Sequence, residues 1–322
     1  MDKVGKRYAA GTISLQGGSG GILAMCSCRD FMEVYKKDKT FRVETPESID
    51  PDELDLDMGF TVKEIKGVGC ANQIIARLMV QSNDAMRIMA VDEDKKILVM
   101  SSLCECKDLM ISCEKIYNEI KNSNDEAFKI LSSQKYGRVI NPFPQIDNLE
   151  EHCSRFLANA KLYLRGLIDL YNIFYDEKIE EVYFNKISSE LEKKYGAENI
   201  IHLLISNNHE MIKKIIDYRN RSEHPNPKLI IKNISLLPGQ KIQVPIWYIE
   251  GQQSKNSIIV EMESIIEFLL EFGELFLLYC CFDRNKSWIK YKIIEIQKCE
   301  RNIDCPKRFN VEIDCSCLKN YM

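Results

Sequence analysis

The chain has 322 residues, of which 45% are hydrophobic and 29% are charged, with a formal net charge of −4 at pH 7. This composition excludes a disordered or collagen-like chain, and the length predicts more than one domain. An acidic chain has no global field that attracts nucleic acid, so any contact with RNA requires a local basic patch.

The predicted elements of residues 1–140 alternate between short strands and helices. In chain order we expect a glycine loop at 17–21, strands at 41–44 and 60–65, and a short helix at 72–80. A hairpin should follow, with strands at 87–91 and 97–100 around a charged turn at 92–96. The last element of this half is a helix at 108–131, with a potential break near 122–125. We therefore predict that this half is a mixed α/β domain.

A strong chain breaker at 141–144, Asn-Pro-Phe-Pro, separates this half from a helical one. In chain order the pattern predicts helices at 147–175, 180–195 and 198–221, strands at 229–234 and 241–249 around a Pro238-Gly239 turn, a helix at 257–282, and short strands at 289–297 and 309–313. The predicted fold class is mainly α. Residues 141–285 form a four-helix bundle with an inserted β-hairpin, residues 1–140 precede it, and residues 286–322 form a small β appendage.

The cysteines and the apolar segments indicate a cellular compartment. Thirteen cysteines is an odd number in a chain too long for a small disulfide-stapled domain. Residues 1–10 are not followed by an apolar stretch that could serve as a secretory signal. The longest apolar region, 264–282, carries Glu267, Glu271 and Glu274 at a spacing that predicts a polar helical stripe. We therefore expect a cytoplasmic protein with mostly free thiols and no membrane span.

One motif carries chemistry. Arg219, Asn220 and His224 form R-N-x-x-x-H at the end of a predicted amphipathic helix. Cleavage of RNA by its own 2′-hydroxyl requires proton transfer and stabilisation of the charge on the phosphoryl group. Histidine transfers protons near neutral pH, and arginine offers a planar, bidentate donor to a phosphate. Asn220 can orient either group or hydrogen-bond the substrate. These residue types are therefore compatible with cleavage of RNA.

This motif, late in the third helix of the predicted bundle, resembles the signature of the HEPN superfamily, in which an arginine and a polar residue precede a histidine. The resemblance implies a HEPN-like fold and a metal-independent endoribonuclease without a cofactor. It also implies a homodimer in which two motifs form one composite site, and a toxin or antiphage-defence role. It does not cover residues 1–140, which we expect to act as a sensor or regulatory domain that binds a regulatory protein or a small-molecule trigger.

A modest basic patch surrounds the motif. The residues predicted to contact RNA are Lys213, Lys214, Tyr218, Arg221 and Lys228, with Tyr218 stacking on a base. An alternative is left open, because arginine and histidine near a helix C-terminus also satisfy free carbonyls and complement the helix dipole. In that case the bundle is a non-catalytic dimerisation or interaction module.

A second alternative is a nucleotidyltransferase joined to the helical bundle. Such enzymes have a Gly-Ser turn followed, after a short helix, by two acidic residues one position apart. The turn at 17–21 is followed by Asp30 and Glu33 at the right distance but with the wrong spacing, whereas Asp55 and Asp57 have the right spacing but lie further away.

A weak zinc site is also a candidate in the C-terminal segment. Its four thiolate ligands would be Cys299, Cys305, Cys315 and Cys317, although their spacing is not that of paired C-x-x-C knuckles. Ordinary reduced thiols are the alternative. The remaining histidines are scattered through predicted helices, and His209 would join the motif only if the third helix were kinked near 207–208.

Overall fold

The computed structural model describes residues 14–55, 57–133, 142–180, 184–224, 226–239, 241–252, 254–285 and 289–314. In this part of the chain the fold is mainly α, as predicted, with seven α-helices and small antiparallel sheets. None of the described helices is long and apolar enough to cross a membrane.

The backbone contacts group the chain into two compact units. The described residues of unit 1 fall within 1–107, 169–178 and 274–322, and those of unit 2 fall within 108–168 and 179–273. Three long helices contribute a segment to each unit: α3 (Glu93–Ser133), α4 (Leu149–Tyr175) and α7 (Ile258–Asp283). The grouping therefore does not follow the predicted boundaries at residues 140 and 285.

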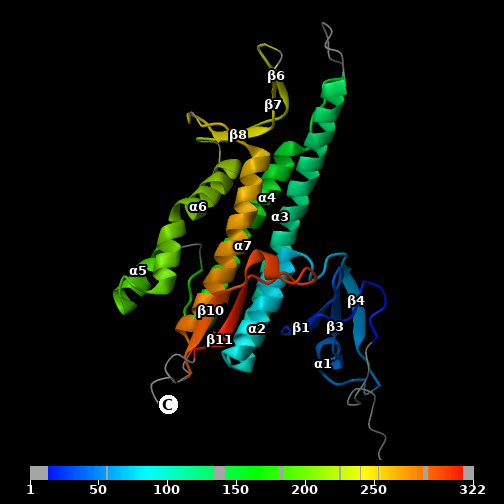
Figure 1. The fold of residues 1–322 in the computed structure, drawn as a ribbon, viewed down its shortest axis with the longest axis vertical. Helices are drawn as coiled ribbons and strands as arrows, with labels where there is room; N and C mark the ends of the chain where they lie inside the picture. The colour runs from blue at the N-terminus through cyan, green and yellow to red at the C-terminus, as the bar shows by residue number, and fades with distance from the viewer. Residues whose placement is uncertain are drawn as a thin grey trace, which may run out of the picture. The chain divides into compact units, whose positions relative to one another are not determined.

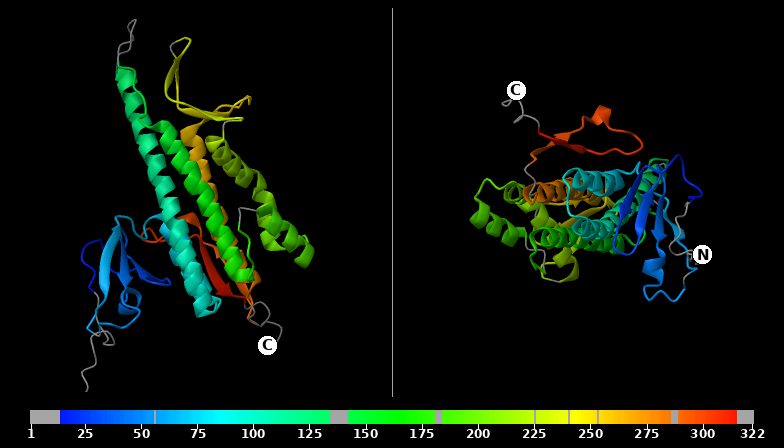
Figure 2. Two further views of the ribbon diagram at one scale, coloured as in Figure 1. Left: turned by 180° about the vertical axis from the view of Figure 1, so that it is seen from behind. Right: turned by 90° about the horizontal axis from the view of Figure 1, so that it is seen from below.

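Unit 1 contains a four-stranded antiparallel sheet whose strands lie side by side in chain order (Figure 2). The strands are β1 (Ala24–Ser27), β2 (Met32–Tyr35), β3 (Thr40–Glu44) and β4 (Thr61–Lys66), and a single helical turn, α1 (Pro46–Ile49), follows β3. Alternation buries Val34, Phe41 and Val43 against Leu15 and Met32. The strands predicted at 41–44 and 60–65 are therefore confirmed.

Strand β2 also carries a carboxylate into the interior of unit 1. Glu33 forms an ion pair with Lys107 of α3, and both side chains are fully buried. The Tyr35 hydroxyl donates to Glu33 at 2.5 Å, and Arg42 Nη2 donates at 3.3 Å. Burial raises the pKa of Glu33, but the Lys107 ammonium and hydrogen bonds from Cys104, Lys107 and Tyr35 outweigh it and hold that pKa below its ordinary value.

A continuous helical segment follows the sheet. It begins as a π-helix, η2 (Ile75–Val80), and continues as α2 (Gln81–Ile88), so the short helix predicted at 72–80 is confirmed and is longer than expected. The two predicted C-terminal strands, β10 (Tyr291–Glu295) and β11 (Phe309–Ile313), pair in antiparallel fashion, with η3 (Lys298–Glu300) between them. Strand β11 packs against α2.

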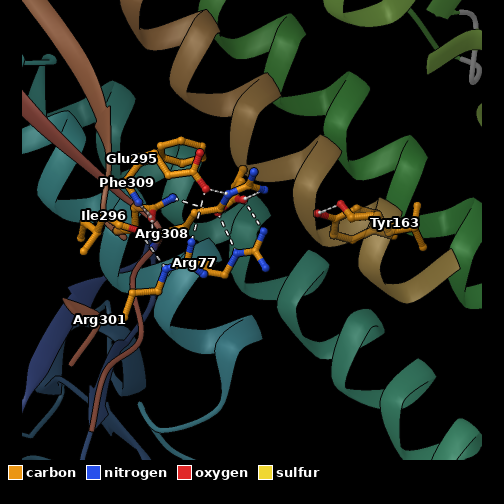
Figure 3. Close-up of polar contacts among 10 residues, drawn as sticks. Arg77, Tyr163, Glu295, Ile296, Arg301, Arg308 and Phe309 are labelled. Carbon is orange, nitrogen blue, oxygen red and sulfur yellow. Dashed lines mark hydrogen bonds and ion pairs between the residues drawn. The ribbon is translucent and has the colours of Figure 1, made fainter. Parts of the chain in front are cut away.

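A network of arginines and glutamates joins η2, α7 and the C-terminal strands within unit 1 (Figure 3). Arg77 Nε donates to Glu274 at 2.8 Å, and Arg308 donates to Glu274 at 3.3 Å and to Glu295 at 2.8 Å. Arg301 reaches Glu295 at 3.3 Å. Glu274 is fully buried, so its assignment to the polar stripe of this helix was wrong: the arginines neutralise it in the interior.

Unit 2 is built from parts of α3, α4 and α7 together with α5 (Phe184–Tyr195) and α6 (Ile200–Glu223) (Figure 1). The Tyr163 hydroxyl of α4 donates to the carbonyl of Leu269 in α7 at 3.0 Å (Figure 3). The next turn of α7 has a glycine, Gly273, where an added Cβ would lie 1.8 Å from that hydroxyl oxygen. The close approach of these helices therefore requires glycine at this position.

The predicted β-hairpin between the third and fourth helices of this half is confirmed, with more strands than expected. Its strands are β5 (Leu229–Lys232), β6 (Ser235–Leu237), β7 (Lys241–Gln243), β8 (Ile246–Ile249) and β9 (Asn256–Ser257). Strands β6 and β7 pair across the Pro238-Gly239 turn, while β5, β8 and β9 form a separate sheet. Trp247 on β8 is fully buried.

The hairpin predicted at 87–100 was wrong. Helix α2 ends at Ile88, Ala90 turns the chain with a φ of 51°, and α3 begins at Glu93 and runs without a break to Ser133. Asp92 Oδ1 accepts a hydrogen bond from the backbone N–H of Lys95 at 3.2 Å. The charged segment is therefore the N-terminal cap of a helix, where acidic residues complement the helix dipole.

Candidate functional site

The candidate motif lies where α6 ends in unit 2. The helix begins after Asn199, whose side-chain oxygen accepts two backbone N–H groups of the first turn at 3.1 Å each. It ends at Glu223, because His224 has an extended backbone with φ −108° and ψ 134°. The N–H of His224 still donates to the Asn220 carbonyl at 2.9 Å. The histidine therefore leaves the helix directly beyond Arg219 and Asn220.

Arg219 pairs with a carboxylate of its own helix. Its Nη2 donates to Glu223 Oε1 one turn later, and the arginine side chain is 18% exposed while that of Glu223 is 50% exposed. The hydrogen bond from Arg219, together with its charge and those of His224 and Lys161, holds the pKa of Glu223 below its ordinary value. Exposed ion pairs of this kind are weak. A phosphate group can therefore compete with Glu223 for the guanidinium.

Asn220 is held by a residue that the sequence did not single out. Lys161 of α4 donates from Nζ to Asn220 Oδ1 at 3.0 Å. The same ammonium lies near enough to Glu223 to lower the pKa of that carboxyl. Lys161 is partly exposed, so a second cation stands beside Arg219 at the end of α6. No local pattern marks this lysine; only the packing of α4 against α6 brings it to the motif.

The chain brings one of its four histidines to this site. His224 is exposed. His209 lies on α6, which continues as one helix through 207–208, so it is about 15 Å from Arg219 along the helix axis. His202 forms hydrogen bonds with Ser188 of α5 at 3.0 Å, and His152 lies 3.7 Å from Glu119 of α3. His209 therefore does not join the motif, because the condition for it is not met.

Tyr218 points into the interior of unit 2. Its ring is 5% exposed and meets the Trp247 ring edge-on at a centroid distance of 5.6 Å. Asn256 donates to its hydroxyl at 3.4 Å. Burial, and then the nearby Glu261 carboxylate, raise the pKa of Tyr218. A buried ring cannot stack on a base, so we leave Tyr218 out of the RNA-binding surface.

The predicted basic residues divide into paired and exposed ones. Lys214 forms an ion pair with Glu261 of α7, which also accepts a hydrogen bond from Trp247 Nε1. Arg221 donates to the Pro227 carbonyl at 3.4 Å. Lys213 and Lys228 are exposed. Lys213 and Lys228 are therefore the predicted RNA contacts that the structure leaves exposed, whereas Lys214 and Arg221 are partly buried.

The geometry does not favour the nucleotidyltransferase alternative. Strands β1 and β2 follow the loop at 17–21, where that alternative requires a helix. Glu33 is buried and paired with Lys107, so it is not available to a metal ion. The Asp55 carboxylate accepts the backbone N–H of Asp57 at 2.9 Å and so closes a local turn.

The zinc candidate lies partly outside the described residues, because Cys315 and Cys317 are not among them. The described cysteines are free thiols, and all except Cys299 are buried. Cys305 contacts Cys70, a residue far away in the sequence. Within the described ranges, no group of three or more histidine, cysteine, aspartate or glutamate side chains is arranged to hold a metal ion.

Comparison with known proteins identifies no relative of this chain. No family model, no curated protein and no solved structure matches the chain. The class that the fold itself defines is a mainly α protein with a β-hairpin inserted between two helices. The resemblance to the HEPN superfamily therefore rests on Arg219, Asn220 and His224 and on the helices around them.

Proposed function

We propose that this chain is a metal-independent endoribonuclease of HEPN type. The observation that supports it best is the grouping of Arg219, Asn220 and His224 at the end of α6, beside Lys161 of α4. Two cations, an oriented amide and an exposed imidazole in one place are what cleavage of a phosphodiester through its 2′-hydroxyl requires.

Each residue has a role that follows from its contacts. Arg219 exchanges Glu223 for the scissile phosphate and stabilises the charge that develops on it. Lys161 fixes the side chain of Asn220 through its oxygen, which leaves the amide N–H groups of Asn220 to donate to the substrate. His224 is exposed at the end of α6, and as a histidine it can transfer the proton near neutral pH.

A homodimer would complete the site. Cleavage needs a base for the 2′-hydroxyl and an acid for the leaving 5′-oxygen, and each chain brings one histidine to the motif. Two motifs facing one RNA strand would supply both groups. The products would be a 2′,3′-cyclic phosphate and a 5′-hydroxyl.

The biological role that we propose is that of a toxin or antiphage-defence effector, and it follows from the HEPN resemblance alone. Residues 1–140 would then respond to a regulatory protein or a small-molecule trigger. The residues of the motif do not select among transfer, messenger and ribosomal RNA.

The test is cleavage of total cellular RNA by the purified chain in EDTA. Arg219→Ala and His224→Ala should each abolish cleavage. His209→Ala is the matched control, since it removes a partly exposed histidine from the same helix and should leave cleavage unchanged. Equal activity of all variants would refute the proposed site. A folded dimer that never cleaves RNA would instead indicate either a nuclease that awaits its trigger or the non-catalytic interaction module, and cleavage that is lost in EDTA would refute the metal-independent mechanism.

A further inference from the structure

A small antiparallel sheet follows the motif directly in the chain. Strand β5 begins at Leu229, shortly after His224, and the sheet β5-β8-β9 lies across the end of α6 in unit 2 (Figure 1). Its inner face packs on the bundle, since Leu229, Trp247 and Ile249 are buried. Trp247 Nε1 also donates to Glu261 of α7. The sheet is therefore anchored to the bundle beside the motif.

The outer face of this sheet carries a tyrosine and lysines. Residues that lie opposite each other on paired strands point to the same face, and Tyr248 of β8 lies opposite Ile230 of β5. Lys232 is two positions further along β5, so it shares this face. Lys255 directly precedes β9, on the other side of β8. Both lysines are exposed and Tyr248 is partly exposed.

The two lysines flank the Tyr248 ring. The Nζ of Lys232 lies 5.8 Å from the ring centroid, and the Nζ of Lys255 lies 5.6 Å from it. Cation–π contacts at exposed sites are weak. Neither ammonium forms an ion pair with a carboxylate in the part of the chain that the structure describes. Both ammonium groups are therefore available to a phosphate, and the ring between them is available to a flat ligand.

The charge of this segment favours nucleic acid as that ligand. Residues 226–257 contain four lysines and one acidic residue, Glu250, whereas the whole chain has a net charge of −4. Proteins hold single-stranded nucleic acid by stacking bases on aromatic rings while basic side chains neutralise the phosphates. An acidic protein surface would use the lysines but would give the ring between them no role. The ring and the lysines together therefore fit a single strand better than an acidic protein.

We propose that the outer face of this sheet binds single-stranded RNA, with one base stacked on Tyr248 and the adjoining phosphates on Lys232 and Lys255. The inference rests on the proposed ribonuclease and makes its substrate unpaired, because a base inside a duplex cannot stack on a side chain. Lys228, exposed between His224 and β5, continues the track of positive charge toward the motif.

The test is the binding of a fluorescein-labelled single-stranded oligoribonucleotide to the full chain carrying His224→Ala, measured by anisotropy in EDTA. Adding Tyr248→Ala should raise the Kd by about fivefold or more, whereas Tyr248→Phe keeps the ring and should leave the Kd unchanged. Tyr195→Ala is the matched control. Tyr195 is an exposed tyrosine of α5, with the Nζ of Lys194 5.4 Å from its ring centroid, and its loss should not change the Kd.

The salt dependence of binding tests the lysines. Each phosphate that a protein neutralises on a single strand contributes about 0.7 to the slope of log Kd against log salt concentration. Combining Lys232→Gln with Lys255→Gln should therefore lower this slope by about 1.4. Lys194→Gln, at an exposed site on α5, should leave the slope unchanged. Both sheet lysines are exposed, so this variant tests the surface even if Tyr248→Ala does not fold.

Three results would overturn the RNA-binding sheet. A folded Tyr248→Ala chain could bind the single strand as tightly as its parent. A duplex RNA of the same length could bind more tightly than the single strand. Poly-glutamate could bind as tightly as RNA and be unaffected by Tyr248→Ala, which would make the sheet a docking surface for an acidic protein.

Binding and cleavage separate this inference from the proposed function. A chain that binds RNA through Tyr248 but never cleaves it would refute the nuclease and keep the sheet. Cleavage that requires His224, with single-strand binding unchanged in the tyrosine and lysine variants, would refute the sheet and keep the nuclease.

Discussion

Replacing Lys107 by methionine tests the buried ion pair of unit 1. Both partners are fully buried, so the substitution leaves the Glu33 carboxylate in the interior with the Tyr35 hydroxyl and the partly exposed Arg42 as neighbours. Breaking a buried pair destabilises proteins by about 3–5 kcal/mol. Because Arg42 remains, we expect the lower end of this range, about 3 kcal/mol, or roughly a 100-fold loss in the folding equilibrium.

The loss of stability caused by Lys107→Met should depend on pH. In the native chain Lys107 helps hold the pKa of Glu33 below that of an unfolded glutamate, about 4.3, so this stabilisation is present above that pH and is lost as pH falls through the folded pKa. Without the ammonium, burial dominates and the folded pKa rises. The variant is then penalised at neutral pH and relieved as its glutamate protonates. The difference in unfolding free energy should therefore shrink between pH 7 and about 4.

The assay is urea unfolding of both proteins across this pH range, with two further variants. Lys115→Met makes the same change at an exposed site on the same helix, where the ion pair with Glu119 is long, and should cost no more than about 1 kcal/mol. Adding Glu33→Gln to Lys107→Met should recover much of the loss. A destabilisation below about 1 kcal/mol, or one independent of pH, would refute this account of the pair.

Three further predictions concern packing and the site. Gly273→Ala should destabilise the chain by about 1–3 kcal/mol in thermal unfolding, although alanine has a better helix propensity than glycine, because the new Cβ meets the Tyr163 oxygen. Adding Tyr163→Phe should recover part of this loss. An unchanged stability of Gly273→Ala would contradict the close approach of the two helices. Gln81→Leu should cost about 1–3 kcal/mol and speed hydrogen exchange of the two amides it accepts, whereas unchanged protection would show that those bonds do not form. Lys161→Met should reduce RNA cleavage by about tenfold or more, because the contact to Asn220 is lost. Lys115→Met changes a lysine outside the proposed site and should leave cleavage unchanged. Equal cleavage by Lys161→Met and the unmodified chain would remove Lys161 from the site.

Long amphipathic helices were predictable from the sequence because their apolar spacing is local and does not depend on which elements they pack against. The helices of 149–175, 200–223 and 258–283, and the hairpin around Pro238-Gly239, follow from periodicity and turn residues alone. The segment 87–100 failed because a run of charges fits a turn as well as a helix start. Asp92 decides the matter by capping α3, a signal that was present in the sequence but outweighed by the apolar residues on each side.

The candidate site was predictable only where its residues share one helix. Arg219, Asn220 and His224 follow from spacing, whereas Lys161 comes from another helix and has no local mark. Tyr218 looked available for stacking because nothing near it in the sequence reveals that Trp247 covers it. The burial of Glu33 was likewise not predictable from the sequence, because it depends on which face of β2 meets α3. Side-chain environment is a tertiary property, and a single sequence does not encode it locally.

The most direct measurement is the chemistry of the RNA ends that the chain produces in EDTA. Cleavage through the 2′-hydroxyl predicts 2′,3′-cyclic phosphate and 5′-hydroxyl ends, which should disappear in His224→Ala and persist in His209→Ala. Fragments with 3′-hydroxyl and 5′-phosphate ends, or cleavage that persists in His224→Ala, would contradict a ribonuclease site at the end of α6.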